Sequence, residues 1–146
     1  YDGDTLVFSS TKERLVPLGE ELSNDPRCRF VEGDFFALAE GKGFDPETPD
    51  RQFDAVLLDI DHSPQNLIHE QHGGFYTLDG LRKFATRIRP GGVFAMWSDD
   101  SPDEQFMAKL SEIFPETDAH VVKFYNPILE KDAESTVYLC RVTGKL

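Results

Sequence analysis

The feature that most constrains the fold is the stretch "FDAVLLDIDHSP", Phe53 to Pro64, in which an apolar run ends in two acids and a histidine. A continuous apolar run of this length is typical of a strand covered on both faces of a parallel sheet. Open α/β sheets bind their ligands beyond the carboxyl ends of their strands. The stretch therefore predicts both an α/β sheet and the edge at which its chemistry lies.

The rest of the chain alternates strand and helix patterns. Strands are predicted at residues 5–9, 27–34, 53–59, 93–98, 119–125 and 135–142, and helices at 17–22, 35–40 (or a turn), 78–88 and 102–114. Residues 41–51 are predicted as an exposed loop, 60–75 as a long loop and 126–134 as a hairpin loop. The expected fold is a Rossmann-like α/β fold, with a mostly parallel sheet, helices on both faces and a C-terminal antiparallel strand pair.

Composition excludes some partners and favours others. The 146 residues suffice for one domain, and 15 basic against 27 acidic residues give a formal net charge of −12. This charge disfavours nucleic acid and anionic membranes and favours cationic ligands. Cys28 and Cys140 are isolated, no apolar run approaches the ~20 residues of a membrane span, and no signal peptide is recognisable. We expect a cytoplasmic location.

Acids end three predicted strands or follow them directly. These are Asp34, the pair Asp59 and Asp61, and the pair Asp99 and Asp100. Carboxylates gathered at one edge raise each other's pKa by repulsion, and bound cations stabilise such a site. The alternative for each single acid is that it caps a strand or begins a turn, as Asp often does.

Two other kinds of site were considered for the same region. A zinc or iron site could use His62, His69 and His72 with the acids, but their segment has no helical period, and the histidines are better explained as a solvated loop. We expect no metal. Ser63 and Ser98 lack the GxSxG context of a serine hydrolase.

The segments "RFVEGDFFAL", "FDAVLLDIDHSP" and "FYTLDGLRKFATRIRPGGVFAMWS" resemble the polyamine aminopropyltransferases, the spermidine and spermine synthases. The resemblance covers about Cys28 to Ser98. It implies the class I methyltransferase fold and a transferase of polyamine biosynthesis. Its reaction would move an aminopropyl group from decarboxylated S-adenosylmethionine, as co-substrate, to a small amine. Homodimers are common in that family.

The resemblance also implies roles for individual residues. Asp34 would accept the adenine amino group and Phe35 would pack on the ring. Asp59 would contact the aminopropyl donor and accept a proton from the amine. In the family a second acid, three residues further on, holds the amine; here Asp61 lies two residues on and His62 three, which is a departure.

The N-terminal part departs further from the family. No glycine-rich cofactor turn is recognisable in residues 1–27. Residues 1–10 resemble the hairpin that precedes the catalytic domain, so residues 11–146 would form a single partial domain, with a segment absent near Ser10 to Lys12. Tyr76 is a candidate substrate contact, although "FY" at a helix entry more often packs in a core.

Three classes of function remain open. The acid pair Asp59 and Asp61 favours aminopropyl transfer, because a protonated amine needs a carboxylate to bind it and take its proton. The same fold could instead carry a methyltransferase that uses S-adenosylmethionine on a small molecule. The missing glycine turn favours a third class, a family member without catalysis that acts in oligomerisation or regulation.

Overall fold

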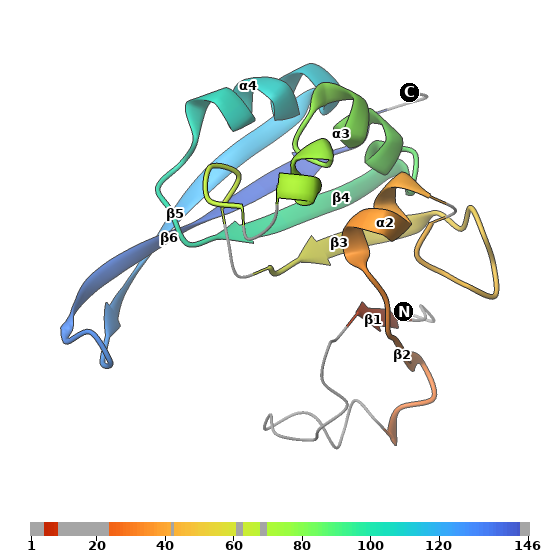
Figure 1. The fold of residues 1–146 in the computed structure, drawn as a ribbon, viewed down its shortest axis with the longest axis horizontal. Helices are drawn as coiled ribbons and strands as arrows, with labels where there is room; N and C mark the ends of the chain where they lie inside the picture. Colours follow the sequence, from red (N-terminus) through yellow and green to blue (C-terminus); the bar gives the residue numbers. More distant parts are fainter. Residues whose placement is uncertain (1–4, 9–23, 42, 61–62, 68–69, 144–146) are drawn as a thin grey trace. The chain divides into compact units, whose positions relative to one another are not determined.

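A computed structural model describes residues 5–8, 24–41, 43–60, 63–67 and 70–143 (Figure 1). The chain divides into two compact units, residues 1–51 and 52–146, and each is described here by itself. The helix predicted after Pro17 and the gap predicted near Ser10 to Lys12 lie outside the described residues. The predicted hairpin at residues 1–10 is described only in part and stays a prediction.

The first unit contains a parallel strand pair and a short helix. Strand β1 (Thr5–Phe8) pairs in parallel with β2 (Cys28–Val31). Helix α2 (Phe35–Glu40) follows β2, which confirms a helix where the sequence allowed a helix or a turn. Asp34 is its N-cap, because an Asp side chain can accept hydrogen bonds from the first free N–H groups of a helix.

The loop after α2 is folded around a buried carboxylate, so the prediction of an exposed loop at residues 41–51 was wrong in its first half. Phe44 and Asp45 are each only 2% exposed. The Asp45 carboxylate accepts from the backbone N–H groups of Glu47 and Thr48, at 3.0 and 3.3 Å, and from the Arg51 side chain at 3.1 Å. These donors offset the cost of burying the charge.

Asp45 predicts an acid-sensitive contribution to stability. Burial alone raises the pKa of this carboxyl group, but hydrogen bonds from Arg51, the Glu47 backbone and Arg29 outweigh burial and lower it. A lowered folded pKa gives stabilisation that is complete above the unfolded value of about 3.9 and is lost as the pH falls through the folded pKa. Asp45→Asn should therefore cost about 2 kcal/mol of unfolding free energy at neutral pH and less below about pH 4.

Urea denaturation at neutral and acidic pH measures this difference. Asp50→Asn is the matched control, because Asp50 is an exposed Asp of the same loop. A destabilisation by Asp45→Asn that is equal at both pH values would contradict the ionised role of Asp45.

The second unit contains a four-stranded mixed sheet in the order β3-β4-β6-β5 (Figure 1). Its strands are β3 (Phe53–Leu58), β4 (Ile88–Ser98), β5 (Glu116–Asn126) and β6 (Lys131–Arg141). β3 and β4 are parallel, whereas β6 is antiparallel to both β4 and β5. The C-terminal antiparallel pair is therefore confirmed, and its strands extend into the predicted hairpin loop.

Two helices and a 3-10 turn lie in the second unit. They are η1 (Glu70–Gly74), α3 (Leu78–Ala85) and α4 (Glu104–Ile113). Thr77 caps α3, and Asp103 immediately precedes α4, which was predicted to begin at Pro102. Both helices lie on the same face of the sheet (Figure 1). Among the described residues, no helix is long and apolar enough to span a membrane.

The segment "RPGG", which follows the predicted helix at 78–88, forms an irregularity inside β4. α3 ends at Ala85, and Ile88, expected on the helix, pairs instead with Phe53 of β3. The next pair is Ala55 with Val93, so β4 contains more residues than β3 over this interval. Gly91 has φ +82°, and a Cβ on Gly92 would lie 2.9 Å from the Asp54 carbonyl oxygen. Glycine fits both positions for these reasons.

Aromatic rings form the core between the helices and the sheet. The Phe84 ring of α3 lies 4.7 Å from the Phe94 ring of β4, and Phe106 of α4 lies 5.1 Å from Tyr138 of β6. All four side chains are at most 1% exposed. The core of the second unit therefore lies on the one face that α3 and α4 cover.

Within the described part of the second unit, β3 is covered on one face, whereas coverage on both faces was predicted. Leu58, on the helix-covered face, is 8% exposed, whereas its neighbour Leu57 is 77% exposed. β3 is an outer strand of its sheet, and neither described helix of this unit covers the face of Leu57. An apolar run alone does not distinguish one covered face from two.

Candidate functional site

The carboxyl ends of β3 and β4 lie side by side and carry three acids. The two strands are parallel, with Leu58 paired to Met96. Asp59 directly follows Leu58, and Asp99 and Asp100 follow the end of β4. All three acids are exposed at this edge. The sheet of the second unit thus presents carboxylates from two adjacent strands to solvent.

In the part of the chain that the structure describes, a side-chain hydrogen bond joins the loop after β3 to the loop after β4. The Asn66 Nδ2 donates to Oδ2 of Asp100 at 2.8 Å and to Oγ of Ser63 at 3.2 Å. Ser63 itself is 2% exposed, so this end of the loop is anchored. Sequence reasoning missed Asn66. The Ser, Pro and Asn of "SPQN" are turn residues and were the signal for a tight turn here.

Two side chains of strand β6 form hydrogen bonds with the backbone of the loop after β4. The Thr136 hydroxyl donates to the Asp100 carbonyl oxygen at 2.7 Å, and the Tyr138 hydroxyl accepts from the Asp103 N–H at 2.8 Å. Burial raises the pKa of Tyr138, which keeps its hydroxyl neutral. The backbone next to Asp100 is therefore positioned by two buried side chains of β6, those of Thr136 and Tyr138.

Trp97 of β4 also contacts this edge. It is half-buried, and its indole N–H donates to Oδ1 of Asp99 at 3.2 Å. The preceding residue, Met96, is fully buried. The indole orients one carboxylate oxygen of Asp99 at the open edge.

Asp34 and Phe35, the predicted adenine contacts, lie in the first unit. Oδ1 of Asp34 accepts from the N–H groups of Phe36 and Ala37, at 2.9 and 3.2 Å. Both bonds use the same carboxylate oxygen. Phe35 is half-buried and stacks on Phe44, with centroids 5.3 Å apart and planes 13° apart. The adenine-binding roles of Asp34 and Phe35 stay a prediction.

Of the predicted substrate contacts, only Tyr76 lies among the described residues; Asp61 and His62 lie outside them. Tyr76 is 4% exposed and packs against Phe75 and Phe106, with centroids 5.1 and 5.6 Å away. Burial raises the pKa of its hydroxyl far above the usual range. This placement agrees with the packing alternative, and the substrate role stays a prediction.

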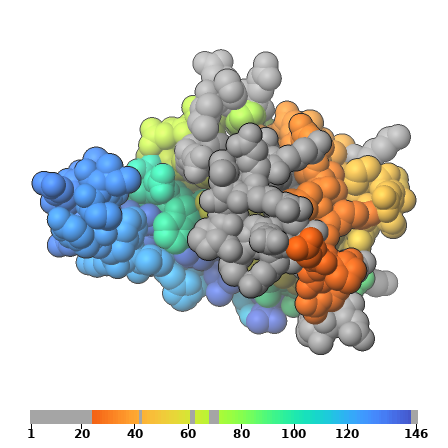
Figure 2. All heavy atoms as spheres, turned by 90° about the horizontal axis from the view of Figure 1, so that it is seen from below, coloured from red at the N-terminus to blue at the C-terminus, as the bar shows by residue number. Residues whose placement is uncertain are grey.

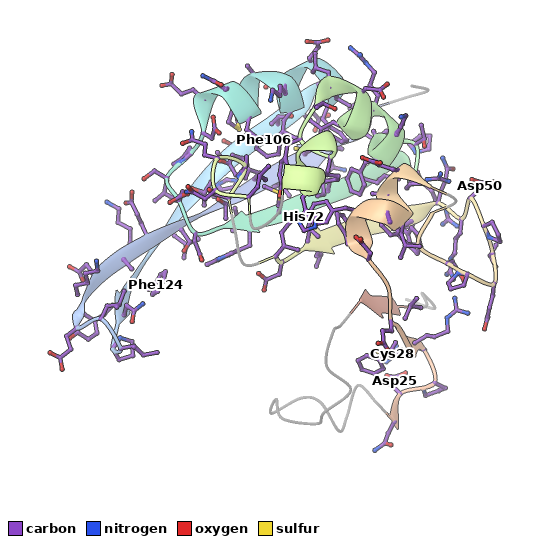
Figure 3. All side chains as sticks on the ribbon, in the orientation of Figure 1. Asp25, Cys28, Asp50, His72, Phe106 and Phe124 are labelled. Carbon is purple, nitrogen blue, oxygen red and sulfur yellow. The ribbon has the colours of Figure 1, made fainter. Side chains whose placement is uncertain are left out.

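Among the histidines considered as metal ligands, His72 lies on η1, whereas His62 and His69 lie outside the described residues. Figure 3 shows His72 among the side chains of the second unit. The described part of the chain contains no group of three or more His, Cys, Asp or Glu side chains placed to hold a metal ion.

Comparison with known proteins identifies the fold. No protein-family model matches the sequence, and no curated protein matches it. Solved structures do match: a probable spermidine synthase from Corynebacterium glutamicum ATCC 13032 at TM-score 0.54 and 18% identity, and a spermidine synthase in complex with the transition state analogue AdoDATO at TM-score 0.61 and 13% identity. Human methyltransferase-like protein 13 in complex with SAH matches at TM-score 0.55 and 17% identity.

These matches cover 88%, 94% and 88% of this chain, but only 44%, 46% and 56% of the three solved chains. The chain therefore spans less than half the length of either spermidine synthase. At such identities the likeness shows the fold alone. The resemblance expected from the strand-end motifs is confirmed at that level: the chain has a spermidine synthase-like, class I methyltransferase fold.

Proposed function

We propose that the protein transfers an aminopropyl group from decarboxylated S-adenosylmethionine to a small amine. The observation that carries this proposal is the row of exposed acids, Asp59, Asp99 and Asp100, at the carboxyl edge of two adjacent parallel strands. Ligands of open α/β sheets bind at this edge. Two of the solved structures that share the fold are described as spermidine synthases.

The acids suit both partners of this reaction. An alkyl amine resembles Lys, with a pKa of about 10.4, so it arrives protonated and cannot attack carbon until it loses a proton. In the proposed step Asp59 accepts that proton, the amine nitrogen forms a bond to the carbon beside the sulfonium, and the carbon–sulfur bond breaks. The electron pair of that bond goes to sulfur, which leaves as a neutral thioether.

The remaining predicted residues have proposed roles around this step. Asp61, His62 and Tyr76 would contact the amine. Asp34 and Phe35 would contact the adenine of the co-substrate. A cytoplasmic location and the absence of nucleic acid and membrane partners also belong to the proposal, because they rest on charge and composition.

A methyltransferase is the second candidate. It is favoured by the match to human methyltransferase-like protein 13, which was solved in complex with SAH. The two candidates differ in the donor. S-adenosylmethionine carries a carboxylate that its decarboxylated form lacks, and exposed acids repel that group.

Calorimetry on the full-length protein distinguishes the candidates. We expect decarboxylated S-adenosylmethionine and 5′-methylthioadenosine to bind, and S-adenosylmethionine to bind more weakly than its decarboxylated form. Tighter binding of S-adenosylmethionine would instead support methyl transfer. Binding of none of the three would contradict both enzymes and support the third class, a family member without catalysis.

A further inference from the structure

The hydrogen bond between Asn66 and Asp100 joins two backbone segments that buried groups hold in place. The Asn66 N–H donates to Oγ of Ser63 at 3.2 Å and to the Ser63 carbonyl oxygen at 3.1 Å. The Asp100 carbonyl oxygen accepts from the Thr136 hydroxyl at 2.7 Å. Ser63 is 2% exposed and Thr136 is 0% exposed. The Asn66 amide and the Asp100 carboxylate therefore each extend from an anchored backbone.

The chemistry of the two groups fixes the direction of this bond. An ionised carboxylate can only accept hydrogen bonds, so the Asn66 amide must present its nitrogen to Asp100. Nδ2 of Asn66 lies 2.8 Å from Oδ2 of Asp100, a length typical of a hydrogen bond to a charged group. An acid at position 66 would place two acceptors opposite each other, and an apolar residue would remove the donor. The contact thus depends on a neutral donor at position 66.

The bond orients Asp100 without neutralising its charge. Other acids of the second unit pair with cations: the Arg89 Nη1 lies 3.0 Å from the Asp54 carboxylate, and the Arg82 Nη2 lies 2.7 Å from the Glu112 carboxylate. Among the described residues, Asp100 forms no ion pair. An amide N–H carries no net charge, so the full negative charge of Asp100 remains available to a cationic ligand.

Asp99, the acid before it, is held in the same way. Its Oδ1 accepts from the indole N–H of Trp97 at 3.2 Å, and it too forms no ion pair within the described part of the chain. Both acids that follow β4 are therefore oriented by neutral donors. They lie at the carboxyl edge, where open α/β sheets bind their ligands.

The bond from Asn66 lies at the surface, which limits what it can do for the fold. Asn66 and Asp100 are both exposed. A hydrogen bond between exposed groups adds little to stability, because water competes for both of them. The same bond restricts the rotamers of the Asp100 side chain before any ligand arrives. A ligand that binds a side chain already ordered in this way loses less entropy and binds more tightly.

We propose that Asn66 is a positioning residue of the candidate site. It holds the Asp100 carboxylate in the orientation in which Asp100 binds the ammonium group of the amine. This inference rests on the proposed aminopropyl transfer and adds a residue that acts on the amine through another side chain. Replacing Asn66 should therefore change the affinity for the amine and leave the affinity for the nucleoside unchanged.

Calorimetric titration of the full-length protein with 1,4-diaminobutane tests this role. Asn66→Ala should weaken binding about 3–10-fold, the effect of ordering one more side chain on binding. Asp100→Ala should weaken binding further, because it also removes the charge. The double variant should bind like Asp100→Ala alone, because Asn66 acts only through Asp100. All three variants should bind 5′-methylthioadenosine as the wild type does, which shows that they are folded.

Ser101→Ala is the matched control. The Ser101 hydroxyl donates to Oε1 of Glu134 at 2.7 Å, so the variant removes one exposed side-chain hydrogen bond from the same loop. Glu134 lies in the part of β6 that pairs with β5 but not with β4, and Figure 2 shows the outer end of these two strands as a blue lobe. The affinity for 1,4-diaminobutane should not change.

Exchanging the two residues separates orientation of the charge from a bond that merely joins two loops. Asn66→Asp combined with Asp100→Asn restores a hydrogen bond with donor and acceptor reversed, but it moves the carboxylate to the loop after β3. We expect this variant to bind 1,4-diaminobutane as weakly as Asp100→Asn alone. Wild-type affinity in the exchanged variant would show that only the connection between the loops matters, and would overturn the proposal.

The remaining outcomes separate this inference from the proposed function. Wild-type affinity of Asn66→Ala, or a double variant weaker than Asp100→Ala, would overturn the role of Asn66 while aminopropyl transfer by the wild type stands. The expected pattern of affinities without any transfer would support the role of Asn66 in binding an amine and contradict the proposed reaction. A wild-type protein that does not bind 1,4-diaminobutane would overturn the role of Asn66.

Discussion

Replacing Asp59 with Asn should lower the rate of aminopropyl transfer by about 10²–10⁴-fold, the usual contribution of a positioned general base. Asn keeps the shape of the side chain but cannot accept a proton from an ammonium group. Asp59 lies at the exposed end of β3, outside the core, so the fold should be unaffected. The measurement is the turnover rate of the full-length protein with decarboxylated S-adenosylmethionine and an amine.

Asp54→Asn is the matched control for this experiment. Asp54 lies near the opposite end of β3 and pairs with Arg89, with the Arg89 Nη1 3.0 Å from its carboxylate. The same chemical change is thus made on the same strand, away from the carboxyl edge, and activity should not fall. Full activity of Asp59→Asn would remove Asp59 from the proposed step and leave the fold assignment intact.

Replacing Phe94 with Ala should cost about 3–5 kcal/mol of unfolding free energy in the second unit. The Phe94 side chain is fully buried, between the rings of Phe84, 4.7 Å away, and Phe114, 6.0 Å away. Its loss removes apolar burial and leaves a cavity between α3 and the sheet. Urea denaturation followed by far-UV circular dichroism measures the change.

Phe124→Ala removes the same atoms from strand β5 and is the control. Phe124 is 41% exposed, and we expect its replacement to cost clearly less unfolding free energy than Phe94→Ala. Equal losses for the two variants would contradict the assignment of the core to the helix-covered face.

Local signals in the sequence predicted much of the second unit. Thr77 caps α3 because its hydroxyl can accept from a free helical N–H, and the bond to the Gly80 N–H is present at 3.1 Å. Phe106 and Leu110, spaced four residues apart, lie on the buried face of α4 as the helical period predicts. Each of these features depends on residues close in the sequence.

Other features depend on distant residues and were predicted wrongly or missed. Ile88 fits the apolar period of α3, but it pairs with Phe53 in the sheet. Asp45 has the composition of an exposed loop, but donors from Arg29 and Arg51 allow it to be buried. The helical period of a segment and the composition of a loop do not reveal such partners, because the partners belong to distant segments that only folding brings together.

The candidate site shows the same division. The order of apolar runs and acids placed Asp59, Asp99 and Asp100 at strand ends, because parallel strands must present their carboxyl ends to one edge. The hydrogen bond from Asn66 to Asp100, which joins the loops after β3 and β4, became evident only in the tertiary structure. The exposure of Leu57 on one face of β3 also became evident only there. The sequence by itself determined which residues end the strands. Pairing and helix placement, which depend on long-range contacts, decided which side chains meet and which remain exposed.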